Sequence, residues 1–308
     1  MTAARRERLA RVVRLCLLLW STLSWALEDP GCTPLVRAAP RTASVDHPSG
    51  LLWRLTPARG APSYLLGTMH IGDPRVMRVM DIARPQFDQA SRFVLEVALD
   101  DAALRGLGEA MFYRDGRRLR AVAGEALFDA TEARLAAHGI AGPLADSIKP
   151  WAAFTTLSMP AESGAALPLD LALMSAAQAA GKEVVGLESV AEQVAVFEGV
   201  AETDQVEMLR EVVCHYGVFQ AELAEMIDAY VTRDLAALVS QAERYANDAK
   251  DALMERLLFA RNERMAARIA PLVDQGQAFI AIGALHLPGE RGVLSLLEAR
   301  GYRVERVY

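Results

Sequence analysis

The sequence is poor in aromatic residues, in cysteine and in positive charge. Only 6% of its 308 residues are aromatic, three are cysteine, and 33 Lys and Arg stand against 39 Asp and Glu. Proteins that bind nucleic acid normally carry a basic surface, so a formal charge of −6 argues against a nucleic-acid partner. With 52% hydrophobic residues, a chain of this length can bury a full core without disulfide or metal crosslinks.

Several catalytic signatures are absent as well. The chain contains no Gly-x-Ser-x-Gly, no His-Glu-x-x-His, no phosphate-binding loop and no dinucleotide-binding fingerprint. It also lacks low-complexity tracts and repeats of fixed period. These absences exclude the common serine-hydrolase, zincin and nucleotide-binding classes, so any chemistry depends on side chains outside those motifs.

The sequence has no run of 18 apolar residues, and its longest apolar stretch, 15–27, is too short for a comfortable membrane span. Five arginines precede this stretch, and Ser24-Trp25-Ala26 ends it with small residues, as in secretory signals. We therefore predict a signal peptide over 1–26, cleaved after Ala26, and a periplasmic or secreted protein. The alternative is an uncleaved anchor, which would be the one membrane contact. Residues 27–49, rich in Pro, Gly and Thr, are predicted to form an extended leader.

Two cysteines remain after export, because Cys16 leaves with the signal peptide. In an oxidising compartment Cys32 and Cys214 have the chance to form a disulfide. The sequence does not show whether they meet in space, so a disulfide and two free thiols both stay open.

Alternating strand and helix patterns predict an α/β (α+β) fold with a mixed, mainly parallel central sheet wrapped by helices. Residues 100–182 form a large helical insertion in this prediction, and 190–275 form a helical array with Gly217 as its main interior break before Pro271. Apolar runs bounded by turn residues or charges predict six strands, near 51–56, 63–67, 92–98, 183–187, 277–283 and 302–307. The first two form a hairpin.

One short element occurs twice, each time directly after a predicted strand. Gly67-Thr68-Met69-His70 follows the second strand, and Gly283-Ala284-Leu285-His286 follows the fifth. Open α/β sheets bind ligands where parallel strands end, so both histidines point to that edge. If the two strands are parallel neighbours, His70 and His286 lie close together although 216 positions separate them.

Two glutamates share this setting. Glu96 lies within one predicted strand and Glu188 ends another, and a buried carboxylate needs a cation, a metal or hydrogen-bond donors. His70, Glu96 and His286 are a donor set that can hold a divalent metal, with Glu188 as base or fourth ligand. Arg261, on an otherwise apolar helix face, can clamp a carboxylate or a substrate oxyanion. The same residues also suit metal-free chemistry with a histidine base, or purely structural roles at a sheet edge and helix N-terminus.

At these residues the chain resembles the TraB/GumN family, with the TIKI membrane-associated proteases as relatives. The resemblance covers roughly 50–308, which we take as one TraB/GumN-like domain, and is carried by YLLGTMHIGD, FVLEV, KPWAAF, VVGLE, RNERMAARI and the C-terminal FIAIGALHLPGERGVLSLLEARGYRVERV. It implies a fold shared with erythromycin-esterase-like and ChaN-like proteins. It also implies metal-dependent peptidase activity with Mn²⁺ or Co²⁺, Zn²⁺ being an alternative.

Carried over by motif, the resemblance assigns His70, Glu96 and His286 to the metal and Glu188 and Arg261 to catalysis. Relatives usually have Gly where this chain has Pro168, which leaves any role of Asp170 open. The expected function is an exported metal-dependent hydrolase acting on a peptide or protein substrate. The alternatives are a metal-independent esterase-like hydrolase and a haem- or peptide-binding protein without turnover.

Overall fold

The computed structural model describes residues 29–39, 44–161, 167–245 and 248–308. It contains one six-stranded sheet in the order β4-β3-β5-β2-β1-β6. The strands are β1 (Leu52–Thr56), β2 (Ser63–Thr68), β3 (Arg92–Val97), β4 (Glu183–Glu188), β5 (Ala278–Gly283) and β6 (Arg303–Arg306). All six predicted strands are therefore confirmed. The predicted signal peptide and its cleavage point lie outside the described residues.

The sheet is mixed and mainly parallel, as predicted. Four neighbouring strands, β4, β3, β5 and β2, run parallel, whereas β1 pairs antiparallel with β2 and with β6. The register between β2 and β5 places Thr68 opposite Gly283. As a result the carboxyl ends of four strands meet at one edge of the sheet, and both Gly-x-x-His elements leave from neighbouring strands.

The parallel strands are apolar over nearly their whole length because helices cover both faces of the sheet. Phe93 of β3 stacks on Phe279 of β5, and Phe87 contacts both rings edge to face. The helices that complete this core include α3 (Val79–Gln89), α9 (Leu169–Ala179), α15 (Ala260–Gln275) and α16 (Val293–Glu298). The sheet is thereby a rigid base for the residues at its carboxyl edge.

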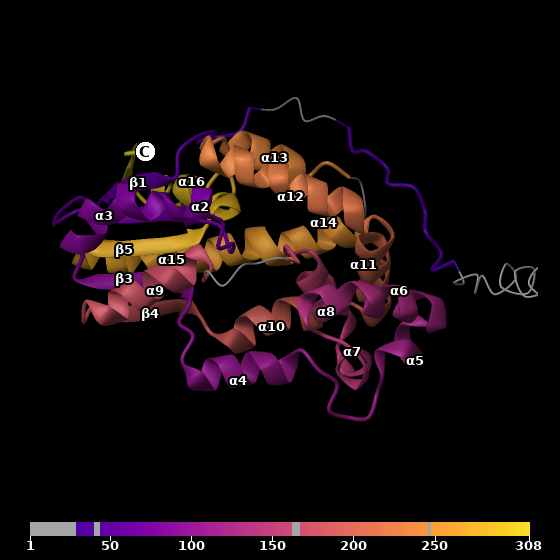
Figure 1. The fold of residues 1–308 in the computed structure, drawn as a ribbon. Coiled ribbons are helices and arrows are strands. Elements are labelled where there is room, and N and C mark those ends of the chain that lie inside the picture. The colour runs from indigo at the N-terminus through magenta and orange to yellow at the C-terminus, as the bar shows by residue number, and fades with distance from the viewer. Residues whose placement is uncertain (1–28, 40–43, 162–166, 246–247) are drawn as a thin grey trace, which may run out of the picture.

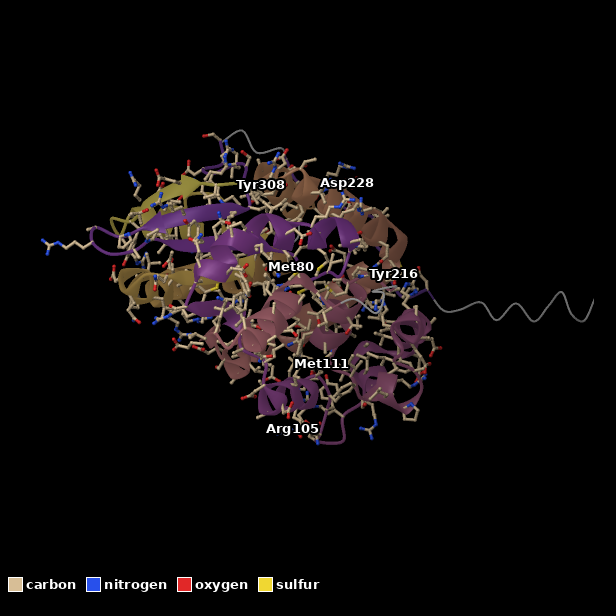
Figure 2. All side chains as sticks on the ribbon, turned by 60° about the vertical axis from the view of Figure 1, so that its left-hand side comes forward. Met80, Arg105, Met111, Tyr216, Asp228 and Tyr308 are labelled. Carbon is tan, nitrogen blue, oxygen red and sulfur yellow. A yellow bond between two sulfur atoms is a disulfide. The ribbon has the colours of Figure 1, made fainter. Side chains whose placement is uncertain are left out.

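A second group of helices extends beyond that edge and surrounds its own apolar core (Figure 1). In Figure 2 the labelled Met111 and Arg105 lie on this side of the molecule, away from Tyr308 on the sheet side. Most of the predicted insertion belongs here, packed with the later helical array. The helices beyond the sheet are α4 (Asp101–Ala110), α5 (Leu119–Ala123), α6 (Glu125–Leu135), α7 (Pro143–Ser147), α8 (Pro150–Leu157), α10 (Val190–Glu198), α11 (Glu202–Cys214), α12 (Tyr216–Val231), α13 (Leu235–Ala242) and α14 (Asp248–Met254), with the short α2 (Pro74–Met77) beside the sheet.

Two details of the helical array differ from the prediction. The array is interrupted at Gly199–Ala201, at His215 and at Thr232–Asp234, and Gly217 lies inside α12. Pro271 lies inside α15 and does not end it. A π-helical turn, Glu255–Phe259, joins α14 to α15. Such turns are frequent at functional sites, and this one lies immediately before Arg261.

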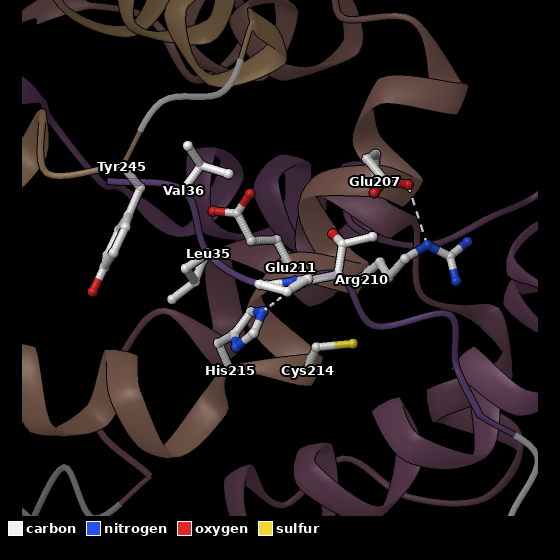
Figure 3. A pocket seen from close by; sticks show the side chains of 10 residues that line it. Leu35, Val36, Glu207, Arg210, Glu211, Cys214, His215 and Tyr245 are labelled. Carbon is white, nitrogen blue, oxygen red and sulfur yellow. Dashed lines mark hydrogen bonds and ion pairs between the residues drawn. The ribbon is translucent and has the colours of Figure 1, made fainter. Parts of the chain in front are cut away.

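The N-terminal segment crosses the helices as an extended strap. Cys32 forms a disulfide with Cys214 at the end of α11, which confirms that pairing. The Thr33 carbonyl accepts a hydrogen bond from the His215 ring at 2.8 Å. The backbone of Arg37 pairs with that of Tyr245 in an isolated antiparallel β-bridge. Figure 3 shows the shallow pocket, about 130 Å³, that the strap forms with α11. Among the described residues, no helix is long and apolar enough to span a membrane.

Candidate functional site

The sheet brings all five predicted site residues together at its carboxyl edge. Glu188 ends β4, Glu96 lies near the end of β3, His286 follows β5 and His70 follows β2. Because these four strands are neighbours, their side chains meet although they are far apart in the sequence. Arg261 reaches the same place from the first turn of α15. The strand-end argument from the sequence therefore holds in the fold.

Each histidine has one ring nitrogen tied to a neighbouring side chain. Nδ1 of His286 lies 2.6 Å from Oδ1 of Asn262, and Nδ1 of His70 lies 3.1 Å from Oδ1 of Asp170. The Asn262 contact fixes the tautomer of His286, with its hydrogen on Nδ1, whereas Nδ1 of His70 forms an ion pair with Asp170. Nε2 of His70 and Cδ2 of His286 border the space beside Gly283. Nε2 of His286 lies 3.8 Å from Oε1 of Glu96 and 3.4 Å from Nη1 of Arg261.

The carboxylates are held by arginine. Arg261 contacts Glu96 Oε2 at 2.5 Å and Glu188 Oε2 at 2.8 Å, and Arg264 contacts Glu188 Oε1 at 2.6 Å. The Glu188 side chain has no exposed surface, and the Arg261 side chain is 7% exposed. Two buried carboxylates are thus balanced by two guanidinium groups, which is the arrangement that such burial requires.

The opposite oxygen of Glu96 faces the histidines. Oε1 accepts a hydrogen bond from the backbone N–H of Gly283 at 2.7 Å and lies 3.8 Å from Nε2 of His286. Burial alone would raise the pKa of Glu96, but the charges of His286, His70 and Arg261 outweigh it and lower that pKa to about 2. Glu96 is therefore ionised at neutral pH, with one oxygen on Arg261 and the other beside the imidazoles.

The pKa values of the two imidazoles are shifted in opposite directions. Burial lowers the pKa of His286 to about 4, against the attraction of Glu96. Loss of water around His70, whose side chain is still 53% exposed, also disfavours charge there, but the Asp170 carboxylate overcomes this and raises the pKa of His70 to about 9. In the metal-free protein at pH 7, His286 is neutral and His70 carries a proton.

Gly283 leaves open the space around which these groups gather. A Cβ atom at Gly283 would lie 3.2 Å from Oε1 of Glu96, 3.4 Å from Cδ2 of His286 and 3.8 Å from Nε2 of His70. Glycine is permitted here because another group can then approach the backbone closely. Gly67, in the first Gly-x-x-His, serves packing instead, since its Cβ would lie 2.8 Å from Leu287.

The donor set fits a divalent cation in its chemistry: two imidazole nitrogens and one carboxylate oxygen. Within the part of the chain that the structure describes, no group of three His, Cys, Asp or Glu is already spaced as metal ligands. Nε2 of His286 and Oε1 of Glu96 are 3.8 Å apart. Two atoms that bind the same cation through bonds of about 2.1 Å are roughly 3 to 3.5 Å apart. His286 and Glu96 would have to approach each other by a few tenths of an ångström to share a cation.

A large cavity opens from this edge into the helices. Its volume is about 590 Å³, within the range of ligand-binding pockets. His70, Glu96, Arg261 and His286 line it, whereas Glu188 does not. Thr68 also lines it, and its hydroxyl is buried without a hydrogen-bond partner among the described residues.

Sequence reasoning missed the residues that hold the site together. It left Asp170 open, although this carboxylate pairs with His70 from the first turn of α9. It gave no role to Arg264 or to Asn262. Asn262 is 1% exposed and follows Arg261 directly, so a buried Arg-Asn pair at the start of a helix was the available signal.

The fold and the site define a mixed-sheet α/β protein whose polar cluster lies where ligands bind such sheets. The chain belongs to the TraB/PrgY/gumN family, which it matches over residues 51–306. It is also similar to metalloprotease TIKI2 of Danio rerio, with 27% identity over 164 residues, 44% of this chain and 32% of that relative. The chain thus spans about a third of the length of the curated relative it matches. No solved structure matches it.

Proposed function

We propose that this protein is a metal-dependent hydrolase that cleaves peptide bonds. One observation carries the proposal. Two histidines with tied Nδ1 atoms and one ionised glutamate oxygen surround the open space at Gly283, at the end of a cavity. Family membership and the similarity to a metalloprotease support the same reaction class.

In this proposal His70, Glu96 and His286 hold a divalent cation, with Mn²⁺ or Co²⁺ expected and Zn²⁺ as the alternative. Such a cation supplies a Lewis acid for water attack at neutral pH. Asp170 and Asn262 orient the two imidazoles from behind, as outer partners of metal-binding histidines commonly do. Hydrolysis adds the hydroxyl of water to the carbonyl carbon and a proton to the departing nitrogen.

The catalytic residues expected from the sequence receive narrower roles. Arg261 lines the cavity, but its N–H groups already contact Glu96, Glu188, the Leu257 carbonyl and, at 3.4 Å, Nε2 of His286, which a bound cation would take over. We therefore assign it electrostatic stabilisation of developing negative charge. Glu188 lies behind Arg261, away from the cavity, so we assign it the positioning of Arg261 in place of a base role.

Export is part of the proposal. The arginine-rich start, the apolar run and the small residues up to Ala26 support a signal peptide. The Cys32–Cys214 disulfide suits the oxidising compartment that export would reach. N-terminal sequencing of the exported protein should begin at Leu27, and a retained Met1 in the membrane fraction would favour the anchor.

The reaction is tested with the purified protein and fluorogenic peptides. Chelation should abolish hydrolysis, and Mn²⁺, Co²⁺ or Zn²⁺ should restore it. Full activity in chelator would instead favour the metal-independent hydrolase. Absence of turnover together with a Soret band on haem addition would favour the binding protein. His138→Ala, at a ring that contacts Tyr216 far from the cluster, is the control and should remain active.

A further inference from the structure

The cavity beyond the metal-binding residues is mainly apolar and deep. It lies among α8, α10, α11, α12, α13 and α14, the helices into which the carboxyl ends of the parallel strands point (Figure 1). We call its apolar part the chamber. Methionine is conspicuous in its wall, at Met69, Met159, Met208, Met226 and Met254. Methionine side chains are flexible and adapt to apolar ligands of varying shape.

The apolar wall begins directly beside the polar residues. Met69 precedes His70 and Leu285 precedes His286, and all four side chains line the cavity. Leu257, one helical turn before Arg261, lines it too. A hydrocarbon chain attached to a carbonyl group beside the two histidines would therefore contact apolar side chains from its first carbon atom onward.

One face of α12 forms much of the chamber wall. Phe219, Leu223, Met226 and Tyr230 are spaced four, three and four residues apart, which places them on one side of a helix. Val218 on the same helix points outward and is 43% exposed. The chamber side and the solvent side of α12 can thus be altered separately.

The chemistry of the wall favours hydrocarbon over peptide. A peptide inside the chamber would bury its N–H and C=O groups among methionine, leucine and phenylalanine, which carry no hydrogen-bonding partners for them. Polar side chains also line the cavity: Glu222 accepts hydrogen bonds from Arg244 at 2.8 Å and from the Tyr245 hydroxyl at 2.5 Å, whereas the buried Oε1 of Gln241 has no hydrogen-bond partner among the described residues. A methylene chain has no polar groups to satisfy and gains from burial.

We infer that the substrate is a long-chain N-acyl amide, with its hydrocarbon chain in the chamber and its acyl carbonyl beside His70 and His286. This inference rests on the metal-dependent hydrolysis of the proposed function and assigns to it the amide bond between a fatty acid and an amino group in place of a peptide bond between two amino acids. The bond that breaks is the C–N bond of the amide. The hydroxyl of water joins the carbonyl carbon to give a fatty acid, and a proton joins the nitrogen to give the amine.

Binding is measured first, by calorimetry on the chelator-treated full chain with acetate, octanoate and dodecanoate as product probes. Each buried methylene contributes about fourfold in affinity, so dodecanoate should bind at least tenfold more tightly than octanoate, and acetate should not bind measurably. Met226→Trp fills the chamber and should weaken dodecanoate binding at least tenfold. Val218→Trp, the matched substitution on the outer face, should bind like the unaltered protein.

A second chamber variant covers the case in which Met226→Trp fails to fold. Leu223→Ser keeps the space open but places a hydroxyl in the wall, and it should weaken dodecanoate binding severalfold. Affinity that does not depend on chain length, or that is equal in Val218→Trp and both chamber variants, would overturn the inference. So would tighter binding of a leucine-rich peptide than of dodecanoate, or displacement of dodecanoate by haem with a Soret band.

Hydrolysis of N-acetyl-, N-octanoyl- and N-dodecanoylglycine then separates this inference from the proposed function. With metal restored, kcat/KM should rise with chain length in the unaltered protein. His70→Ala and His286→Ala should still bind dodecanoate but cleave none of the three. Chain-length-dependent binding without any hydrolysis would contradict the hydrolase proposal and keep the chamber assignment. Hydrolysis that favours the acetyl substrate would contradict the chamber assignment alone.

Discussion

The backbone N–H of Gly283 donates a hydrogen bond to Oε1 of Glu96 at 2.7 Å. The second Gly-x-x-His element therefore fixes the strand glutamate directly, through its glycine, before its histidine contributes anything. This contact joins two neighbouring parallel strands at their ends. It explains why the glycine belongs to the site as much as His286 does.

Gly283→Ala should remove metal binding while the fold remains. The backbone of Gly283, with φ of −53°, suits alanine. The added methyl group would therefore cause no backbone strain, but it would fill the space between Glu96, His286 and His70. Gly67→Ala is the contrasting variant, since its methyl group would meet Leu287 at 2.8 Å in the core. We expect Gly67→Ala to lower the melting temperature. Metal analysis and circular dichroism on both variants check this, and equal melting losses would contradict it.

The outer partners of the histidines should tune metal affinity without binding metal themselves. Asp170→Ala and Asn262→Ala each release an Nδ1 atom, so the imidazole loses its fixed orientation. We expect metal affinity to fall roughly 10- to 100-fold in each. Competition with a fluorescent chelator measures this. Unchanged affinity in both variants would mean that the rings are held by other contacts.

Removing one buried charge should destabilise the protein strongly. Glu188→Gln leaves Arg264 without its carboxylate partner and Arg261 with Glu96 alone. Breaking a buried ion pair from one side costs about 3 to 5 kcal/mol in free energy of unfolding. The control is Glu255→Gln, which breaks the exposed pair with Arg291 and should cost less than about 1 kcal/mol. Urea denaturation distinguishes the two, and similar losses would refute the buried network.

The chelator-treated protein should lose stability as the pH falls from 6.5 to 4. In this interval the unfolded chain binds a proton at His286, whereas the folded protein, with a pKa of about 4 at this ring, does not. Unfolding therefore takes up a proton, and the free energy of unfolding declines by an amount on the order of 2 kcal/mol. His286→Gln should flatten this part of the profile. A profile identical in both proteins would place the acid sensitivity elsewhere.

The sheet and the polar residues at its carboxyl edge followed from the sequence because their signals are local. Six apolar runs with turn residues between them predicted six strands, and Gly-x-x-His after two of them predicted that His70 and His286 meet. To predict that the two histidines lie close together, one further rule was needed: the carboxyl ends of neighbouring parallel strands lie at the same edge of the sheet.

The rest depends on how helices dock, which local patterns do not encode. Asp170 and Arg264 reach the site from α9 and α15, whose orientation is set by packing against the sheet. Gly217 was expected to end a helix because glycine has low helix propensity, yet α12 continues through it from a break at His215. The chamber lies between six helices, so no single segment of the sequence predicts it.

The central claim, that His70 and His286 act on one cation, is tested most directly by metal content. The unaltered protein, His70→Ala, His286→Ala, the double variant and His138→Ala are loaded with Mn²⁺, Co²⁺ or Zn²⁺, desalted and analysed by mass spectrometry. We predict one equivalent in the unaltered protein and in His138→Ala, and almost none in either single variant or the double variant, because the two ligands act as one unit. Full metal content in His70→Ala or His286→Ala, with the fold intact by circular dichroism, would contradict the account.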